Sequence, residues 1–283
     1  MELQRRVEAG MEAMLGIRFL ASEYPTGPWH RGRIDTLGLD ENNTPVVIEY
    51  KKGADSGVMS QAVSYLSWLC SARHEFEALA SKKLGSQAAE VIDWRSPRMV
   101  CIAADFSHHD RVAVHRLNER IDLVRYRVFD GGLLSLLLVE SVPGATRSVA
   151  SPREVQKREG SADADCAKSV RTTLDAAPAS LRALYGELDE RLTASGEVEV
   201  DVKLHYVAYR RMMNVACVIF RPKNEEVLVY LKVDPDTVPL EEGFSRDMRG
   251  IGHLGTGDLE VRIGSAADLE RAGPLIRRAF EAA

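Results

Sequence analysis

Two hydrophobic periods alternate along the first 140 residues and divide them into elements. Apolar positions three or four residues apart predict helices over residues 2–15, 58–83 and about 109–119. Apolar segments of strand length predict strands over residues 33–39, 45–51, 99–104, 121–129 and 133–140. The first two strands flank a polar loop of five residues and therefore form a hairpin. The order helix, hairpin, helix, strand, helix, strand predicts an α/β unit with a mixed sheet.

A second series of elements occupies the C-terminal part of the chain. Helical spacing predicts helices over residues 181–192 and 266–282. Strands are expected over residues 198–204, 214–221, 227–233 and 259–263. A loop over 243–257 precedes the last strand. Strands bracketed by terminal helices predict a small α+β domain.

The segment between these two series differs in composition from both. Residues 142–179 are rich in Pro, Gly, Ser and Ala, carry mixed charge and show no sustained apolar period. Such a composition is typical of a linker, here with room for a short helical piece. The sequence therefore predicts a domain over residues 1–141, a linker over 142–179 and a second domain over 180–283.

The overall composition is that of a globular protein, with 45% hydrophobic and 28% charged residues. A net charge of −5 argues against a protein that coats nucleic acid without specificity, although it permits a local basic surface. The chain has no run of 18 apolar residues, no apolar signal segment behind its first residues and no CxxC pair among its four cysteines. These features predict a cytoplasmic protein without a membrane span, a structural zinc or a disulfide framework.

The predicted hairpin carries the clearest candidate chemistry. If Leu39 faces Pro45 across the loop, the numbers of paired residues sum to 84, and Asp35 lies opposite Glu49. Because side chains alternate along a strand, Glu49 and Lys51 share one face. Two carboxylates beside a lysine in an apolar setting suit Mg²⁺, which prefers oxygen ligands and activates water for attack on phosphate. The alternative is a surface hairpin with an ordinary salt bridge.

The hairpin sequence GRIDTLGLDENNTPVVIEYKKG resembles that of the PD-(D/E)XK nuclease superfamily, and more narrowly that of NucS-related endonuclease-like proteins. Asp35 matches the first acidic position of the motif. Glu49, Tyr50 and Lys51 match its ExK element. The resemblance spans residues 2–140 and implies a restriction-endonuclease-like mixed sheet flanked by helices, followed by a smaller α+β domain.

The resemblance also implies residues outside the hairpin. In this superfamily an acidic residue of the first helix joins the metal site. Glu8 matches best, and Glu12, one turn later, is the alternative. A QxxxY element corresponds to Gln61 and Tyr65, which share a helical face. Without the resemblance, Gln61 would be interpreted as solvent-facing and Tyr65 as a core residue.

The resemblance further implies a division of roles. The expected ligands of Mg²⁺ or Mn²⁺ are Glu8, Asp35, Glu49 and the Tyr50 carbonyl. Lys51 would position the attacking water or stabilise the developing negative charge, and Gln61 would adjust the arrangement of the site. Catalytic roles are therefore expected for Asp35, Glu49, Lys51 and Gln61.

Basic and aromatic residues near the hairpin are candidates for nucleic-acid contact. These candidates are Arg31, Arg33, Lys52 and Tyr65. Each cation is equally compatible with a plain solvated charge. Trp29 suits stacking on a base or packing against the sheet. The sequence His108-His109-Asp110 resembles a metal cluster, but its place at the expected start of a helix favours first-turn roles.

Residues 181–283 resemble an uncharacterised C-terminal domain that is found behind such nuclease-like modules and is sometimes labelled a predicted transport protein. The matching segments are VAYRRMMNVACVIF, VLVYLKVDPDTV and GFSRDMRGIGHLGTGDLEVRI. Glycines in the last segment expose backbone N–H groups, and Arg246, Arg249 and His253 accompany them, which suggests an anion-binding loop. A glycine-dependent turn into the last strand is the alternative.

The sequence thus predicts a two-domain protein. Its N-terminal domain is expected to be a divalent-metal-dependent endonuclease that hydrolyses phosphodiester bonds, with DNA as the expected substrate in repair or defence. The C-terminal domain is expected to recognise substrate or a partner, such as a second copy of the chain. The rival hypothesis is a non-catalytic nucleic-acid-binding or scaffold protein that keeps the nuclease fold.

Overall fold

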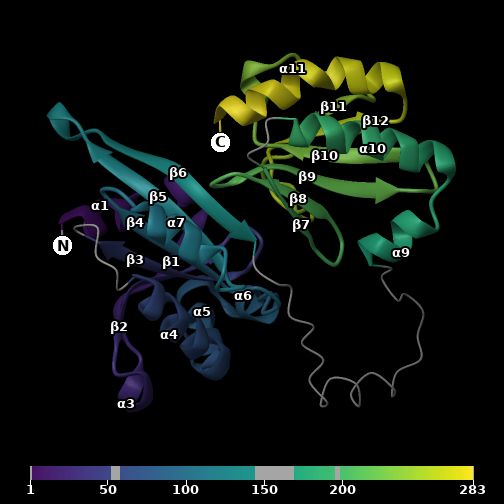
Figure 1. The fold of residues 1–283 in the computed structure, drawn as a ribbon. Coiled ribbons are helices and arrows are strands. Elements are labelled where there is room, and N and C mark those ends of the chain that lie inside the picture. Colours follow the sequence, from purple (N-terminus) through teal and green to yellow (C-terminus); the bar gives the residue numbers. More distant parts are fainter. Residues whose placement is uncertain (1, 52–57, 144–168, 195–197, 283) are drawn as a thin grey trace, which may run out of the picture. The chain divides into compact units, whose positions relative to one another are not determined.

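The computed structural model describes residues 2–51, 58–143, 169–194 and 198–282. The chain divides into two compact units, Met1–Ser161 and Ala162–Ala283 (Figure 1). Across the described ranges, every helix is too short or too polar to cross a membrane. Three cysteines fall within these ranges, and all are free thiols: Cys70, Cys101 and Cys217.

Unit 1 is built on a six-stranded mixed sheet, which confirms the predicted mixed α/β architecture. Its strands follow each other in chain order: β1 (Ile17–Pro25), β2 (Arg33–Asp40), β3 (Pro45–Lys51), β4 (Arg98–Ala103), β5 (Arg120–Val128) and β6 (Leu134–Pro143). β3, β4 and β5 run parallel, and the other neighbours are antiparallel. The helices are α1 (Glu2–Ala9), α2 (Met11–Leu15), α3 (Gly27–His30), α4 (Val58–Ser71), α5 (Arg73–Leu84), α6 (Ser86–Glu90) and α7 (His108–Val114).

Helices cover both faces of this sheet. Leu69 of α4 and Phe76 of α5 belong to the same buried cluster as Leu37 of β2. The next residue of β2, Gly38, faces the other way, and a Cβ placed there would lie 3.1 Å from Cε of Met11 in α2. The missing side chain of Gly38 therefore lets α2 approach the sheet closely. α4 and α2 thus lie on opposite faces of β2 and β3.

Three details of unit 1 differ from the sequence-based expectations. The strand β1 was not expected, and a register shift between Phe19 and Ala21 explains why its hydrophobic alternation is irregular. The expected helix over 2–15 is interrupted at Gly10, which separates α1 from α2. The expected helix over 58–83 is interrupted at Ala72, between α4 and α5.

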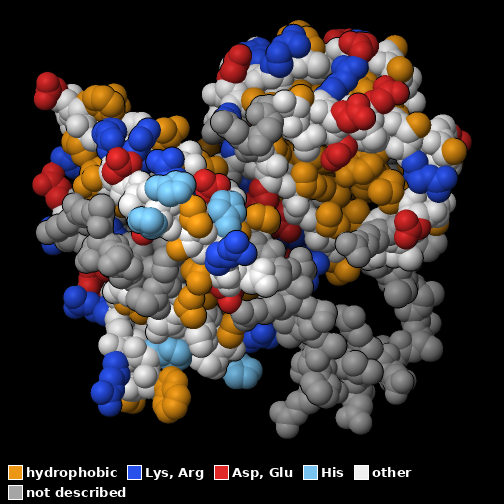
Figure 2. All heavy atoms as spheres, viewed as in Figure 1, with side chains coloured by type: hydrophobic (Ala, Val, Ile, Leu, Met, Phe, Trp, Pro, Cys, Tyr) orange, Lys and Arg blue, Asp and Glu red, His pale blue; other side chains and the backbone are white. Residues whose placement is uncertain are grey.

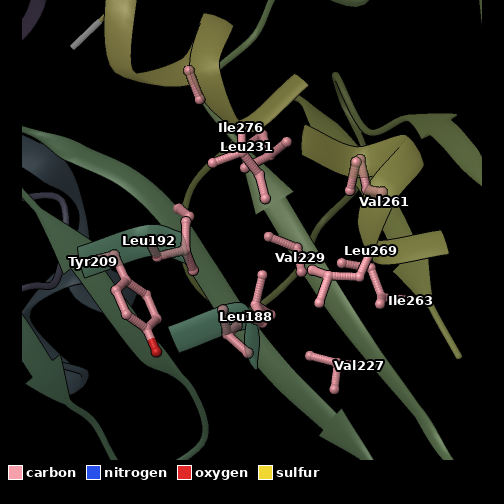
Figure 3. Packing of buried hydrophobic residues seen from close by; sticks show 14 of the residues in the cluster. Leu188, Leu192, Tyr209, Val227, Val229, Leu231, Val261, Ile263, Leu269 and Ile276 are labelled. Carbon is pink, nitrogen blue, oxygen red and sulfur yellow. The ribbon is translucent and has the colours of Figure 1, made fainter. Parts of the chain in front are cut away.

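Unit 2 is a six-stranded antiparallel sheet in the order β11-β12-β10-β9-β8-β7. The strands are β7 (Glu199–Val202), β8 (Val207–Arg210), β9 (Asn214–Arg221), β10 (Glu226–Leu231), β11 (Ser245–Asp247) and β12 (Leu259–Ile263). The helices are α9 (Val170–Asp175), α10 (Ala179–Thr193) and α11 (Ala266–Ala282). Figure 3 shows leucine and isoleucine side chains of α10 and α11 against valines of β10 and β12, which form one buried cluster.

The predicted linker needs a correction at both ends. β6 continues to Pro143. At the other end, α9 begins at Val170, whose side chain is buried in the core of unit 2. Residues 142–143 and 170–179 therefore belong to the two units, and residues 144–168 lie outside the described residues. Two short strands of unit 2, β8 and β11, were also not predicted.

Candidate active site

The hairpin of β2 and β3 has the predicted register. Cα partners run from Leu39 and Pro45 to Thr36 and Ile48. Beyond this point the two strands are joined through a side chain. The backbone N–H of Tyr50 donates to Oδ2 of Asp35 at 2.9 Å, where a backbone carbonyl would otherwise accept. The Asp35 carboxylate is thereby fixed at the point where the ladder of the two strands ends.

Glu49, Lys51 and Gln61 form one contact network beside Asp35. Nζ of Lys51 lies 3.4 Å from Oε1 of Glu49 and donates to Oε1 of Gln61 from α4. The Glu49 side chain is only 6% exposed and that of Lys51 17%. Within the described residues, Oε2 of Glu49 has no hydrogen-bond partner. The network therefore contains a buried carboxylate whose second oxygen has no hydrogen-bond partner in the described residues, which calls for an explanation.

Both carboxyl groups resist ionisation. The pKa of Glu49 is raised to about 7, mainly by burial and then by the nearby charge of Asp35, with Lys51 acting in the opposite direction. Burial also raises the pKa of Asp35, against the hydrogen bond from the Tyr50 backbone. Two ionised carboxylates beside a single lysine leave an excess negative charge. A bound cation would relieve that charge.

Glu8 lies near the pair but is held elsewhere. Its Oε1 accepts from Oγ1 of Thr36 at 2.6 Å and from Nε2 of Gln4 at 3.2 Å. Since Thr36 follows Asp35 in the strand, its side chain points to the opposite face of the sheet. Across the described ranges, no three His, Cys, Asp or Glu residues gather in a group able to hold a metal ion. The expected ligand Glu8 is thus not brought together with Asp35 and Glu49.

Two residues around Glu8 were not among the sequence-based candidates. Nε2 of Gln4 also donates to the carbonyl of Asp35 at 2.9 Å, so Gln4 links α1 to β2. The i,i+4 spacing of Gln4 and Glu8 was the only signal available in the sequence. Thr36 gave none. The alternative ligand Glu12 is exposed on α2, after the helix break.

The candidates for nucleic-acid contact fall into three groups. Arg31 and Arg33 are exposed, and Nε of Arg33 pairs with Oε2 of Glu23 at 2.6 Å. Lys52 lies outside the described residues. Tyr65 is only 5% exposed, and its hydroxyl donates to the carbonyl of Arg33. This burial agrees with the alternative interpretation of Tyr65 as a core residue, and its hydroxyl supports the loop that carries the arginines.

The alternatives for Trp29 and for the two histidines are resolved by exposure and capping. Trp29 is 90% exposed, so the interpretation that it packs against the sheet is wrong. Ser107 caps α7, and Asp110 donates to and accepts from it in a capping box. The first-turn interpretation of His108, His109 and Asp110 is therefore confirmed.

Arg249 and His253 of the glycine-rich loop contact other residues of unit 2. Arg249 forms ion pairs with three aspartates: Asp234, Asp236 and Asp247. The His253 ring stacks on Tyr230, with centroids 4.4 Å apart and planes 8° apart. Arg246 lies in β11 opposite Glu260 of β12. These contacts engage Arg249 and His253, whereas Arg246 is exposed, so an anion-binding role for the loop stays a prediction.

The comparisons with known proteins extend over both units without assigning an activity. Residues 170–283 match the model of a domain family described as a domain of unknown function, DUF5655. A Haemophilus influenzae protein described as uncharacterized is 25% identical over 289 residues, which cover 99% of this chain and 92% of that protein. No solved structure matches the chain significantly.

Proposed function

We propose that unit 1 is a divalent-metal-dependent endonuclease module of the PD-(D/E)XK type, which hydrolyses phosphodiester bonds with DNA as its substrate. The observation that carries the proposal is the pair of half-buried Asp35 and buried Glu49 with a single lysine, Lys51, beside it. A mixed sheet with helices on both faces supports a restriction-endonuclease-like fold. Perturbed carboxyl groups of this kind cluster at functional sites.

The donor set fits Mg²⁺ or Mn²⁺. Asp35 and Glu49 supply hard oxygen ligands, and the buried Oε2 of Glu49 has no hydrogen-bond partner in the described residues. The Tyr50 carbonyl is the third proposed ligand. A metal ion held there would polarise the phosphate and lower the pKa of a bound water.

The other residues of the network act on charge and orientation. The Lys51 ammonium group has three N–H donors, and Gln61 accepts one of them. A second donor faces Oε1 of Glu49 at 3.4 Å. The third would orient the attacking water or hold a phosphate oxygen as negative charge develops. Gln61 is a positioning residue in this scheme, because it acts on the reaction through Lys51.

A non-catalytic nucleic-acid-binding protein is the second candidate, and one observation favours it. Glu8 is held by Thr36 on the opposite face, so the described carboxylates form a pair and not a group of three. A site with two carboxylates can bind a metal weakly without cleaving. Activity measurements are needed to separate the two functions.

Nicking of supercoiled plasmid by the full chain tests the proposal. The parent is expected to nick in Mg²⁺ or Mn²⁺ and to be inactive in EDTA. Lys51→Ala should lower the rate by ~10²–10³-fold, because a well-placed electrostatic group contributes about 3–4 kcal/mol to transition-state stabilisation. Its affinity for Mn²⁺ in calorimetry should persist. Glu49→Gln should lose both cleavage and metal affinity.

Lys82→Ala is the matched control, because Lys82 is an exposed lysine in the last turn of α5. It should cleave at the parental rate. If Lys51→Ala also cleaves at that rate, the endonuclease proposal fails. If the parent binds plasmid but never nicks it, the non-catalytic function takes its place.

A further inference from the structure

The loop between β1 and β2 presents a tryptophan to solvent. At 90%, Trp29 is the most exposed of the large hydrophobic side chains in the described residues. It lies in α3, which Figure 1 places at the outer end of β2. An aromatic ring held away from the core contributes nothing to packing in unit 1. Exposed tryptophans of this kind commonly serve as anchors in binding.

The loop is closed on itself at its base. The Thr26 hydroxyl accepts from N of Gly32 and donates to O of Gly32, both at 2.9 Å. Backbone bonds join Thr26 N to Gly32 O and Arg31 N to Gly27 O, each at 3.0 Å. Thr26 is 4% exposed, so these hydrogen bonds at the base of the loop are shielded from water. The ring of Trp29 is therefore carried by a pre-organised loop, which lowers the entropic cost of binding.

The base of this loop also contacts residues that lead to the candidate active site. A Cβ on Gly32 would lie 2.8 Å from the Tyr65 ring, and the Tyr65 hydroxyl holds the carbonyl of Arg33 at 3.1 Å. Arg33 precedes Asp35 by two residues, which places it about 7 Å away along the strand. The loop thus leads directly to the carboxylate pair.

The charge of the loop matches an anionic partner. Residues 26–33, TGPWHRGR, contain two arginines and a histidine and no carboxylate. Arg33 is paired with Glu23 of β1 at 2.6 Å, so Arg31 beside Trp29 is the cation that carries this argument. Figure 2 shows hydrophobic and basic side chains together at the end of unit 1 where α3 lies. An exposed arginine such as Arg31 beside an exposed aromatic ring suits a phosphate and a base face of the same strand.

We propose that Trp29 stacks on an unpaired nucleobase a few nucleotides from the phosphate bound at Asp35 and Glu49. This inference rests on the proposed function of that site. Bases inside a duplex are already stacked, so the ring gains a partner only where a base is unpaired. Trp29 is then the residue that selects nucleic acid with a single-stranded nucleotide beside the cleavage position.

Metal-free binding tests this inference without depending on cleavage. Fluorescence anisotropy in EDTA compares a labelled 20-nucleotide oligo(dT) strand with a 20-base-pair duplex. Trp29→Ala should weaken single-strand binding by about 5- to 150-fold, the range found for a base–aromatic stack. Duplex affinity should stay within about twofold. Trp29→Phe keeps an aromatic ring and should retain most of the single-strand affinity.

Phe129→Ala is the control for general loss of exposed aromatic surface, because Phe129 is 54% exposed outside this loop. It should bind both probes like the parent. The inference is overturned if Trp29→Ala binds the single strand normally, if it loses both probes equally, or if Phe129→Ala has the same effect. A parent that nicks plasmid while Trp29→Ala binds normally overturns the inference and leaves the endonuclease in place.

Discussion

The starts of β4 and β5 and the end of β3 both bury charged side chains, in opposite ways. At the first place, Nε of Arg98 donates to Oδ2 of Asp122 at 2.6 Å, and Ser141 donates to the other oxygen of that carboxylate. Asp122 is fully buried and Arg98 is 1% exposed. At the second place, Asp35 and Glu49 share Lys51. At the first place the buried carboxylate of Asp122 has its own cation, whereas at the second two carboxylates face one cation.

This difference separates a structural cluster from a candidate functional one. A buried ion pair with satisfied hydrogen bonds stabilises a particular arrangement of the sheet and resists the loss of either partner. Two coupled carboxyl groups with raised pKa values destabilise the folded protein when both are ionised. Such a site is maintained at a cost to stability, as expected where a ligand supplies the missing charge. The same substitution, acid to amide, should therefore have opposite effects at the two places.

The largest effect is expected from Asp122→Asn. The change leaves Arg98 buried without its main carboxylate and should destabilise unit 1 by about 3–5 kcal/mol. All three tryptophans lie in unit 1, so urea unfolding followed by tryptophan fluorescence reports on this unit. Asp130→Asn, on the exposed β5–β6 turn, should change stability by less than ~0.5 kcal/mol. A loss of stability below ~1 kcal/mol for Asp122→Asn would show that the buried charge of Arg98 does not depend on the Asp122 carboxylate.

Glu49→Gln should stabilise the metal-free protein at pH 8. The folded-state pKa of about 7 exceeds the ordinary value of 4.5. The folded protein therefore binds the extra proton, and the associated stability is lost as the pH rises through 7. Glutamine avoids this loss, with a gain of about 2–3 kcal/mol at pH 8. Unfolding in EDTA at pH 4 and pH 8 checks the sign, since the gain should vanish at pH 4. Destabilisation at pH 8 would contradict the comparison.

Mn²⁺ affinity should fall with acidity because a proton on Glu49 competes with the ion. With a pKa of about 7, calorimetry should find about tenfold weaker binding at pH 6 than at pH 8. Glu49→Gln provides the reference, with weak binding at both values. An affinity that is equal at pH 6 and pH 8 in the parent would place the metal away from this pair.

The smallest effect is expected from Thr36→Val. It removes the hydroxyl that donates to Glu8 and should cost about 1 kcal/mol, since half-buried Glu8 can turn to water. Mn²⁺ affinity should be unchanged, because Glu8 and Thr36 lie on the face opposite Glu49. An altered affinity would bring Glu8 into the metal site and make it a group of three.

The sequence was sufficient for the hairpin register but not for the surroundings of the site. Loop length determined that Leu39 faces Pro45, and alternation then placed Asp35, Glu49 and Lys51. The direction of Glu8 depends on which face of the sheet α1 covers, which is a matter of tertiary packing. The partners of Arg249 likewise come from segments that only the fold brings together. Local rules predict strands and their facing residues, whereas contacts between distant segments need the structure.

The parallel pairing of β3 with β4 has a consequence for folding kinetics. The β2–β3 hairpin closes through a short loop, whereas β4 joins β3 only after the residues between Lys51 and Arg98 have been brought across the sheet. Local hairpins form within microseconds, and distant pairings cost more loop entropy and follow later. Glu49 therefore enters the hairpin while still hydrated and ionised. Its burial beside Cys101 comes with the later docking of β4. Because burial raises the pKa of Glu49, we expect proton uptake to accompany this step and the final closure of unit 1 to be faster in mild acid than in alkali.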